Sequence, residues 1–266
     1  MLNALRQIFR KPEKERRIAH VPQGERWYVI GDIHGRLDLL EVLQEAIEAD
    51  DAACAPANST VVFLGDLVDR GPDSAGVIKL ARNWGKVRKV RYLAGNHEEM
   101  FLESFDDKEM LRHFLRHGGR ETVLSYGLKR KEYNRMQIAE VQKAMHKIVP
   151  QKHRDFLAGF EDMIVVGDYV LVHAGINPKR PVEEQKRKDL LWIRERFLNH
   201  AESFSHVVVH GHTIFEEVED TGDRVGIDTG AFRTGVLTAL VLEGDSRRRI
   251  QAFEAEDGSI AVRKQD

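Results

Sequence analysis

Short apolar runs alternate with helical patterns through the first hundred residues. Residues 26–30 form an apolar run typical of a buried strand, and 37–49 place three leucines and an isoleucine on one helical face. The order recurs with an apolar run at 60–64, a helical pattern at 74–84 and a third run at 87–93. Polar residues follow each run directly. Three strand–loop–helix units in succession predict an open α/β sheet that binds its ligand beyond the strand ends.

The rest of the chain follows other patterns. Residues 98–162 are highly charged and mostly helical in pattern, which predicts a helical insertion. A hairpin over 163–172 and a short helix over 188–198 are expected next. A strand is then expected at 206–210. The C-terminal part is expected to be antiparallel, with short strands at 225–228, 236–242, 249–255 and 260–262. No linker separates two parts, so we expect one mixed α/β layered domain over 23–266.

Composition narrows the class of protein. The 266 residues are 42% hydrophobic, enough for a globular core and too many for a wholly disordered chain. One cysteine excludes a disulfide scaffold and a four-cysteine zinc site. No run of 18 apolar residues and no secretory signal are present, so we expect a cytoplasmic protein without stable membrane association. The 41 basic and 43 acidic residues leave a net charge of −2, which gives no overall reason to bind nucleic acid. Oligomeric state stays open.

The N-terminus differs from the body in charge. Its first 20 residues hold six basic and two acidic residues, a net charge of +4. We expect a solvated basic arm over 1–22, with a membrane-surface helix as the alternative.

Residues of the types that bind metals stand at nearly every expected strand end. Two-metal hydrolases need such oxygen and imidazole ligands around two divalent ions about 4 Å apart. Asp32 and His34 are separated by one residue, so both can point to one side of an extended segment. The other strand ends offer the remaining candidates: Asp66, Asp69, Asn96, His97, His173, His210 and His212.

Five segments together resemble a known family. They are Gly-Asp-Ile-His-Gly (31–35), Gly-Asp-Leu-Val-Asp-Arg-Gly (65–71), Gly-Asn-His-Glu (95–98), His-Ala-Gly (173–175) and His-Gly-His-Thr (210–213). In this order they resemble the calcineurin-like metallophosphoesterases over about residues 26–242. Within that superfamily they are most similar to the phosphoprotein-phosphatase branch, near bacterial serine/threonine phosphatases related to lambda phosphatase. The resemblance implies an α-β-β-α sandwich with the insertion, 98–162, over the site.

The same resemblance implies six ligands for two divalent ions. Asp66 would bridge the ions, and the other five would form two sets: Asp32, His34 and His212 on one ion, Asn96 and His173 on the other. Manganese is the expected metal, with iron, zinc, nickel or cobalt as alternatives.

Four further residues take roles from the resemblance. His97 would be the general acid that protonates the leaving oxygen, and Asp69 would hold its imidazole. Arg70 and Arg194 would bind the phosphate, because a guanidinium offers paired hydrogen bonds and a permanent charge.

These roles predict a two-metal phosphomonoesterase that uses a metal-bound water. The expected substrate is a phosphoprotein or phosphopeptide carrying phosphoserine or phosphothreonine, with phosphotyrosine as a further case. The alternative is a dinucleoside polyphosphate (Ap4A-type) hydrolase. Ala94 stands where many relatives have an arginine, which favours the alternative, whereas Arg70 and Arg194 favour the monoesterase. A catalytically silent phosphate-sensing or scaffold protein is a third reading, opposed by the intact ligand set.

Other chemistry-bearing residues receive plainer interpretations. His113 and His117 are one helical turn apart but lack a nearby carboxylate to complete a metal site. His210 is expected to pack beside the ligands, and Cys54 to have no catalytic part. The remaining residues noted are Phe232 and Asp228, expected to pack and support the site, and Arg120 and Tyr126, which could face substrate.

Overall fold

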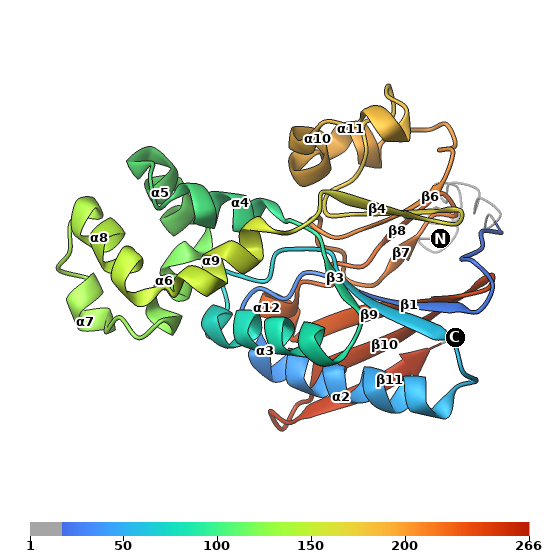
Figure 1. Cartoon of the computed structure of the whole chain (residues 1–266), viewed down its shortest axis with the longest axis horizontal. Coiled ribbons are helices and arrows are strands. Elements are labelled where there is room, and N and C mark those ends of the chain that lie inside the picture. The colour runs from blue at the N-terminus through green and yellow to red at the C-terminus, as the bar shows by residue number, and fades with distance from the viewer. Residues whose placement is uncertain (1–17, 266) are drawn as a thin grey trace, which may run out of the picture.

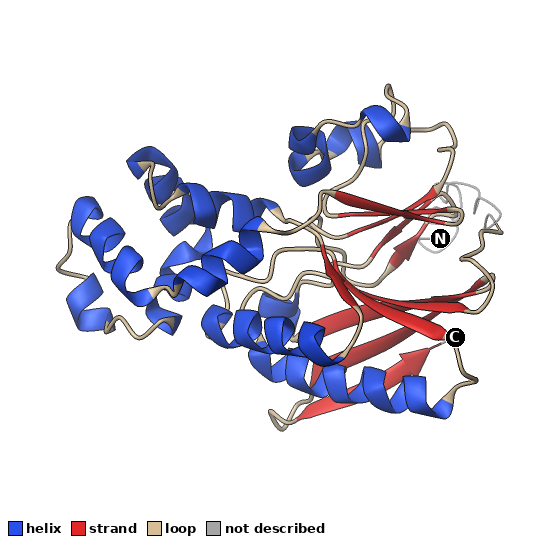
Figure 2. Ribbon diagram, in the orientation of Figure 1, coloured by secondary structure: helices blue, strands red, loops and turns tan. Residues whose placement is uncertain are grey.

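The computed structural model describes residues 18–265, and its strands form two sheets that lie face to face (Figures 1 and 2). The larger sheet has the order β11-β10-β9-β1-β2-β3. Its strands are β1 (Glu25–Ile30), β2 (Asn58–Phe63), β3 (Val90–Tyr92), β9 (Val236–Glu243), β10 (Ser246–Glu254) and β11 (Ile260–Gln265). Strands β1, β2 and β3 are parallel, whereas β9, β10 and β11 continue the sheet antiparallel.

The smaller sheet has the order β4-β5-β6-β8-β7. Its strands are β4 (Met163–Val166), β5 (Tyr169–Val172), β6 (Val207–His210), β7 (Glu219–Asp220) and β8 (Arg224–Gly226). The predicted hairpin is confirmed as β4 and β5. Strand β8 pairs parallel to β6 and antiparallel to β7, so the antiparallel arrangement expected for the C-terminal part holds for only one of its two pairings.

Helices cover both outer faces, which gives the α-β-β-α layering that the resemblance implies (Figure 1). On the larger sheet lie α2 (Leu37–Ala53) and α3 (Ser74–Val87); on the smaller sheet lie α10 (Arg187–Trp192) and α11 (Glu195–Leu198). The short helices elsewhere are η2 (Val182–Glu184) and α12 (Ala231–Thr234). One helix was expected over 188–198, but the chain is extended at Ile193 (ψ 143°), which separates α10 from α11.

The insertion is helical, as predicted, and extends to the left in Figure 1. It contains α4 (Asn96–Glu103), α5 (Lys108–Phe114), a π-helical turn η1 (Leu115–Gly119), α6 (Arg120–Ser125), α7 (Arg130–Tyr133), α8 (Ile138–Ile148) and α9 (Gln151–Ala158). Its apolar residues, such as Phe101, Phe114 and Met145, belong to the same core as α2 and α3. This shared core fixes the insertion against the sheet.

Strand β1 shows how the alternation of side chains builds the layers. Trp27 and Val29 pack between the two sheets, whereas Tyr28 and Ile30 pack under the helices. Successive residues of a strand point to opposite faces, so a strand buried on both sides is apolar throughout. This explains the continuous apolar runs in the sequence.

Two features lie at the margins of the described chain. Most of the predicted basic arm, residues 1–17, lies outside the described residues, while Ala19 and Val21 at its end are buried. No helix within residues 18–265 is long and apolar enough to cross a membrane.

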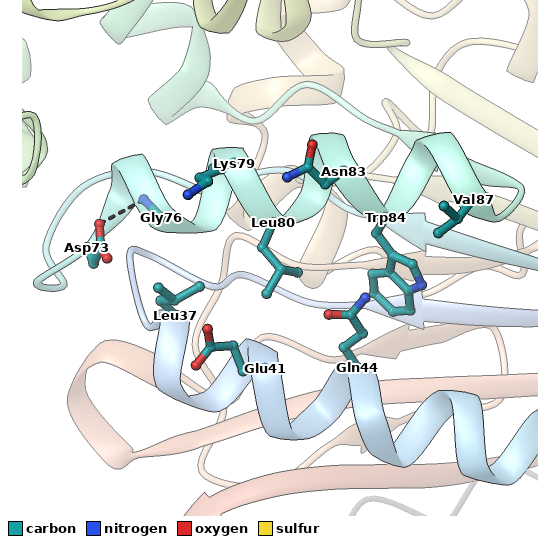
Figure 3. Close-up of a pocket in the computed structure, with 10 residues that line it drawn as sticks. All are labelled: Leu37, Glu41, Gln44, Asp73, Gly76, Lys79, Leu80, Asn83, Trp84 and Val87. Carbon is teal, nitrogen blue, oxygen red and sulfur yellow. Dashed lines mark hydrogen bonds between the residues drawn. The ribbon is translucent and has the colours of Figure 1, made fainter.

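A groove of about 590 Å³ runs between α2 and α3 (Figure 3). Leu37, Leu80 and Trp84 line it, and Asp73 at its end accepts a hydrogen bond from the Gly76 backbone N–H at 2.7 Å. None of the predicted metal ligands lines this groove. The candidate ligands lie instead at the strand ends.

Asp50 on α2 is the carboxylate that joins this helix to the larger sheet. It is buried and accepts hydrogen bonds from Tyr28, Arg248 and Lys264 at 2.6–2.9 Å. Asp50→Asn leaves these donors without their charged partner, so we expect a loss of about 2 kcal/mol in the free energy of unfolding. Urea denaturation measures it. Asp38→Asn, which alters an exposed pair with Arg36, is the control and should change stability by less than about 0.5 kcal/mol. Equal effects would contradict this view of Asp50.

Candidate active site

Backbone strain is concentrated at the strand ends. Within residues 18–265, the non-glycine residues with positive φ are His34 (47°), Asp66 (52°), Asp69 (75°), Arg70 (68°) and His212 (62°). All five are predicted site residues. This left-handed conformation costs about 1 kcal/mol or more at each such residue and persists only where its surroundings enforce it.

Glu98 stabilises the left-handed conformation at Asp66. Its buried carboxylate accepts hydrogen bonds from the backbone N–H groups of Asp66 (2.7 Å), Leu67 (2.7 Å) and Gly95 (2.9 Å). The Asp66 carbonyl accepts from the His34 N–H at 2.9 Å. One side chain thus fixes two neighbouring loops. The motif includes Glu98, but the sequence alone gave it no role.

Asp66 lies at the centre of the candidate metal ligands. Its Oδ1 is 3.4 Å from His173 Nε2, and its Oδ2 is 3.6 Å from His34 Nε2. Asn96 Oδ1 lies 3.0 Å from His173 Nε2. Side chains from both sheets therefore converge on one carboxylate, an arrangement suited to a ligand that bridges two cations.

The structure groups His212 differently from the prediction. Donor atoms of Asp66, His173 and His212 lie within 4.8 Å of one another, and those of His34, Asp66 and His97 form a second such group. The His212 imidazole thus lies in the group that contains His173. The Asp32 carboxylate accepts a hydrogen bond from the backbone N–H of His212 at 3.0 Å.

The charges and burial of these groups fit divalent cations. The buried Nε2 of His212 has no hydrogen-bond partner in the described chain, and burial lowers the pKa of His212 to about 2, which keeps its nitrogen free to bind a metal. Burial and the neighbouring carboxylates Asp228 and Asp66 raise the pKa of Asp32. Burial opposes ionisation of Asp66, but the surrounding imidazoles outweigh it and lower its pKa. Three carboxylates packed this closely need positive charge beside them.

Asp228 is the third of these carboxylates. Its Oδ1 accepts the Gly230 N–H at 2.9 Å, while its Oδ2 is buried without a hydrogen-bond donor in the described chain. Burial raises its pKa to about 6. Asp228 therefore adds negative charge behind Asp32, beyond the supporting role expected of it.

His97 and Asp69 form a buried pair next to the metal ligands. His97 Nδ1 lies 2.6 Å from Asp69 Oδ2, and the other oxygen of Asp69 accepts a hydrogen bond from Thr122 at 2.7 Å. Burial lowers the pKa of His97, but Asp66 and Asp69 outweigh it, so the net shift is upward. A protonated imidazole in this position can give its Nε2 proton to a leaving group. Thr122 lies 53 residues from Asp69 and in no motif, so the sequence gave no signal for it.

The two predicted phosphate ligands differ in exposure. The Arg70 guanidinium is half-buried, 2.9 Å from His34 Nε2 and 3.0 Å from His97 Nε2. Its Cζ lies 4.8 Å from the ring centre of Phe232, which places Phe232 at the site and not only in the packing. Arg194 is exposed. Burial is the main cause that lowers the pKa of His173, and the positive charge of Arg194 contributes to the same shift.

The remaining candidates lie apart from the ligands. His210 is fully buried and packs edge-on against Phe197, with ring centres 5.0 Å apart. Tyr126 bonds to His153 at 3.0 Å, and Arg120 lies over the ring of Tyr133; both of these contacts are within the insertion.

Comparisons with known proteins agree with this geometry. The model of the calcineurin-like phosphoesterase family matches residues 26–236. Bis(5'-nucleosyl)-tetraphosphatase PrpE (asymmetrical) of Anoxybacillus flavithermus is 28% identical over 80% of this chain and 88% of its own length. Serine/threonine-protein phosphatase 1 of Salmonella typhimurium is 29% identical over 79% of this chain and 89% of its own.

A solved structure shares the fold over nearly the whole length. It is provisionally described as a diadenosine tetraphosphatase, and it superposes with a TM-score of 0.58 at 20% identity, covering 94% of this chain and 98% of its own. The two sheets, the converging ligands and the family match lead to one conclusion: this chain belongs to the calcineurin-like phosphoesterase family and is a metal-dependent phosphoric ester hydrolase.

Proposed function

We propose that this enzyme hydrolyses bis(5′-nucleosyl) polyphosphates. The alternative in the sequence analysis thus takes precedence over the phosphoprotein phosphatase. The observation that carries it is a set of basic side chains on or next to the turn that contacts Arg70: His113, Arg116 and His117, named here the basic rim. The relatives named as tetraphosphatases support it, as does Ala94, a buried residue without a charge for the phosphate.

The basic rim lies on the turn that contacts Arg70. The Gly118 carbonyl accepts the Arg70 N–H at 3.1 Å, and a Cβ added at Gly118 would lie 2.7 Å from Arg70 Cγ. Gly118 has a φ of 109°, so glycine is required both by the backbone and by the close approach. The rim is therefore held beside the phosphate-binding arginine.

Arg116 supplies the permanent positive charge of the rim. Burial lowers the pKa of His113, and the further causes are His117, Arg116 and His97, all of them bases. The ring centres of His113 and His117 are 4.1 Å apart. A leaving group that carries further phosphates would meet the charge of Arg116 here, and its negative charge would favour protonation of the neighbouring imidazoles. A serine or threonine leaving group carries no further phosphate for the rim to bind.

The ligands described above fit two divalent ions, with Asp66 between them and His173, His212 and Asn96 on one side. When bound, the ions would supply an activated water and neutralise charge on the phosphate. Arg70 and Arg194 would orient the phosphate oxygens. His97 would give its Nε2 proton to the leaving oxygen, on the side where the rim lies, and Asp69 would hold the imidazole through Nδ1.

A phosphoprotein phosphatase is the second candidate. The Salmonella relative supports it, and so do the two arginines, which bind a terminal phosphate as readily as an internal one. The two candidates share the metal site and differ in the leaving group.

The metal site gives the first prediction for function. Titration of metal-free protein with Mn²⁺ should show two sites, and chelation should abolish hydrolysis of an aryl phosphate. Asp66→Asn should weaken both sites at least about tenfold, because the bridging charge is lost. Asp73→Asn, on a carboxylate outside the ligand set, should leave both sites intact. Two unweakened sites in Asp66→Asn would contradict the bridging role.

The substrate gives the second prediction. Rates on diadenosine tetraphosphate and on peptides with phosphoserine, phosphothreonine or phosphotyrosine should be compared at one metal concentration. We expect kcat/KM to be at least about tenfold higher for the nucleotide, through contacts of the leaving phosphates. Higher values for a phosphopeptide would establish the second candidate instead.

The basic rim gives the third prediction. The double substitution Arg116→Ala with His117→Ala should raise KM for diadenosine tetraphosphate about tenfold and leave KM for 4-nitrophenyl phosphate unchanged, because the aryl phosphate has no further phosphate to bind. Arg130→Ala, on α7 at the outer edge of the insertion (Figure 1), is the matched control. Equal changes on both substrates would remove the rim from substrate binding.

A further inference from the structure

We infer that Thr122, on helix α6 of the insertion, is a positioning residue for the proton donor. Its hydroxyl would hold Asp69 in the orientation that aligns His97 with the leaving group. The inference rests on the proposed role of His97 and holds for either substrate class, because both need a protonated leaving oxygen.

Two hydrogen bonds join Thr122 to Asp69, Ser74 bonds to both residues, and all three side chains are buried. Thr122 Oγ1 donates to Asp69 Oδ1 at 2.7 Å and accepts the Asp69 backbone N–H at 2.8 Å. Ser74 Oγ accepts the same N–H at 3.0 Å and lies 2.9 Å from Thr122 Oγ1. Asp69, Thr122 and Ser74 each have no measurable exposure, so water cannot replace any of these partners.

The direction of each hydrogen bond follows from counting protons. A hydroxyl has one proton, and the Asp69 carboxylate has none to give when ionised, so the Thr122 proton goes to Asp69. Ser74 then donates to Thr122. The donor from Thr122 occupies Oδ1, which leaves Oδ2 for His97 Nδ1 at 2.6 Å. Thr122 is thus the side chain that determines which carboxylate oxygen faces the imidazole.

The same hydroxyl also supports strained backbone. Asp69 has a φ of 75°, an unfavourable conformation for a residue with a side chain. Its N–H, shared by Thr122 and Ser74, is one of the contacts that maintain it. Since α6 begins directly after the turn that carries Arg116 and His117, the insertion connects the basic rim to the proton donor.

The test compares leaving groups. Hydrolysis of 2,4-dinitrophenyl, 4-nitrophenyl and phenyl phosphate is measured for the full chain with Mn²⁺, and for Thr122→Val, Thr122→Ser and His97→Asn. Valine keeps the branched shape and removes the hydroxyl. We expect Thr122→Val to lower kcat about tenfold for phenyl phosphate and less than about threefold for the dinitrophenyl ester, which needs little protonation. Thr122→Ser should restore kcat to within about threefold of the unsubstituted enzyme.

Ser125→Ala is the matched control on the same helix. The Ser125 hydroxyl bonds only to backbone, donating to the Thr122 carbonyl at 2.7 Å and accepting the Ala75 N–H at 3.1 Å. It should show no dependence on the leaving group. A loss in Thr122→Val that is equal for all three esters, or that serine does not restore, would overturn the inference.

A second readout does not depend on turnover. The Nδ1 proton of His97 in its short bond to Asp69 should give a downfield NMR resonance, assigned by its disappearance in His97→Asn. It should shift in Thr122→Val and stay in Thr122→Ser; an unchanged resonance in both would overturn the inference. Failure of the acid role itself is distinguishable: His97→Asn would then lose rate equally for all three esters.

Discussion

A buried carboxylate at the meeting point of the two sheets is the constraint on which the rest of the structure depends. Asp66 is 2% exposed and in the left-handed region, and imidazoles from both sheets lie within 4 Å of its oxygens. Burial alone would neutralise it, but the surrounding bases keep it charged. The Glu98 carboxylate accepts a hydrogen bond from the Asp66 backbone N–H and so stabilises the strained loop that carries Asp66. The strand ends of both sheets converge at Asp66 and bring these imidazoles to it.

The strand ends and the insertion carry different parts of the candidate site. Strand ends carry the metal ligands, which any member of the family needs, whereas the insertion carries the contacts next to the leaving group. Thr122 reaches Asp69 from one side, and Gly118 contacts Arg70 from another.

The sequence predicted the layers, and the strand ends at which the candidate ligands lie, for a physical reason. Strands buried on both faces are continuous apolar runs, and their ends carry polar residues at short spacing, so both signals are local. Contacts between distant residues left no such signal. Thr122 lies in an ordinary helical pattern, and Phe232 was expected only to pack. The grouping of His212 with His173 depends on how two strands of the smaller sheet align. The break at Ile193 was equally hidden, because apolar residues continue through it.

The binuclear site around Asp66 is tested most directly by anomalous scattering from crystals grown with Mn²⁺. Two anomalous peaks are expected, about 4 Å apart. One should lie beside His34 and the other beside His173 and His212, with Asp66 between them. A single peak, or peaks on ligands other than these, would contradict the bridging role of Asp66.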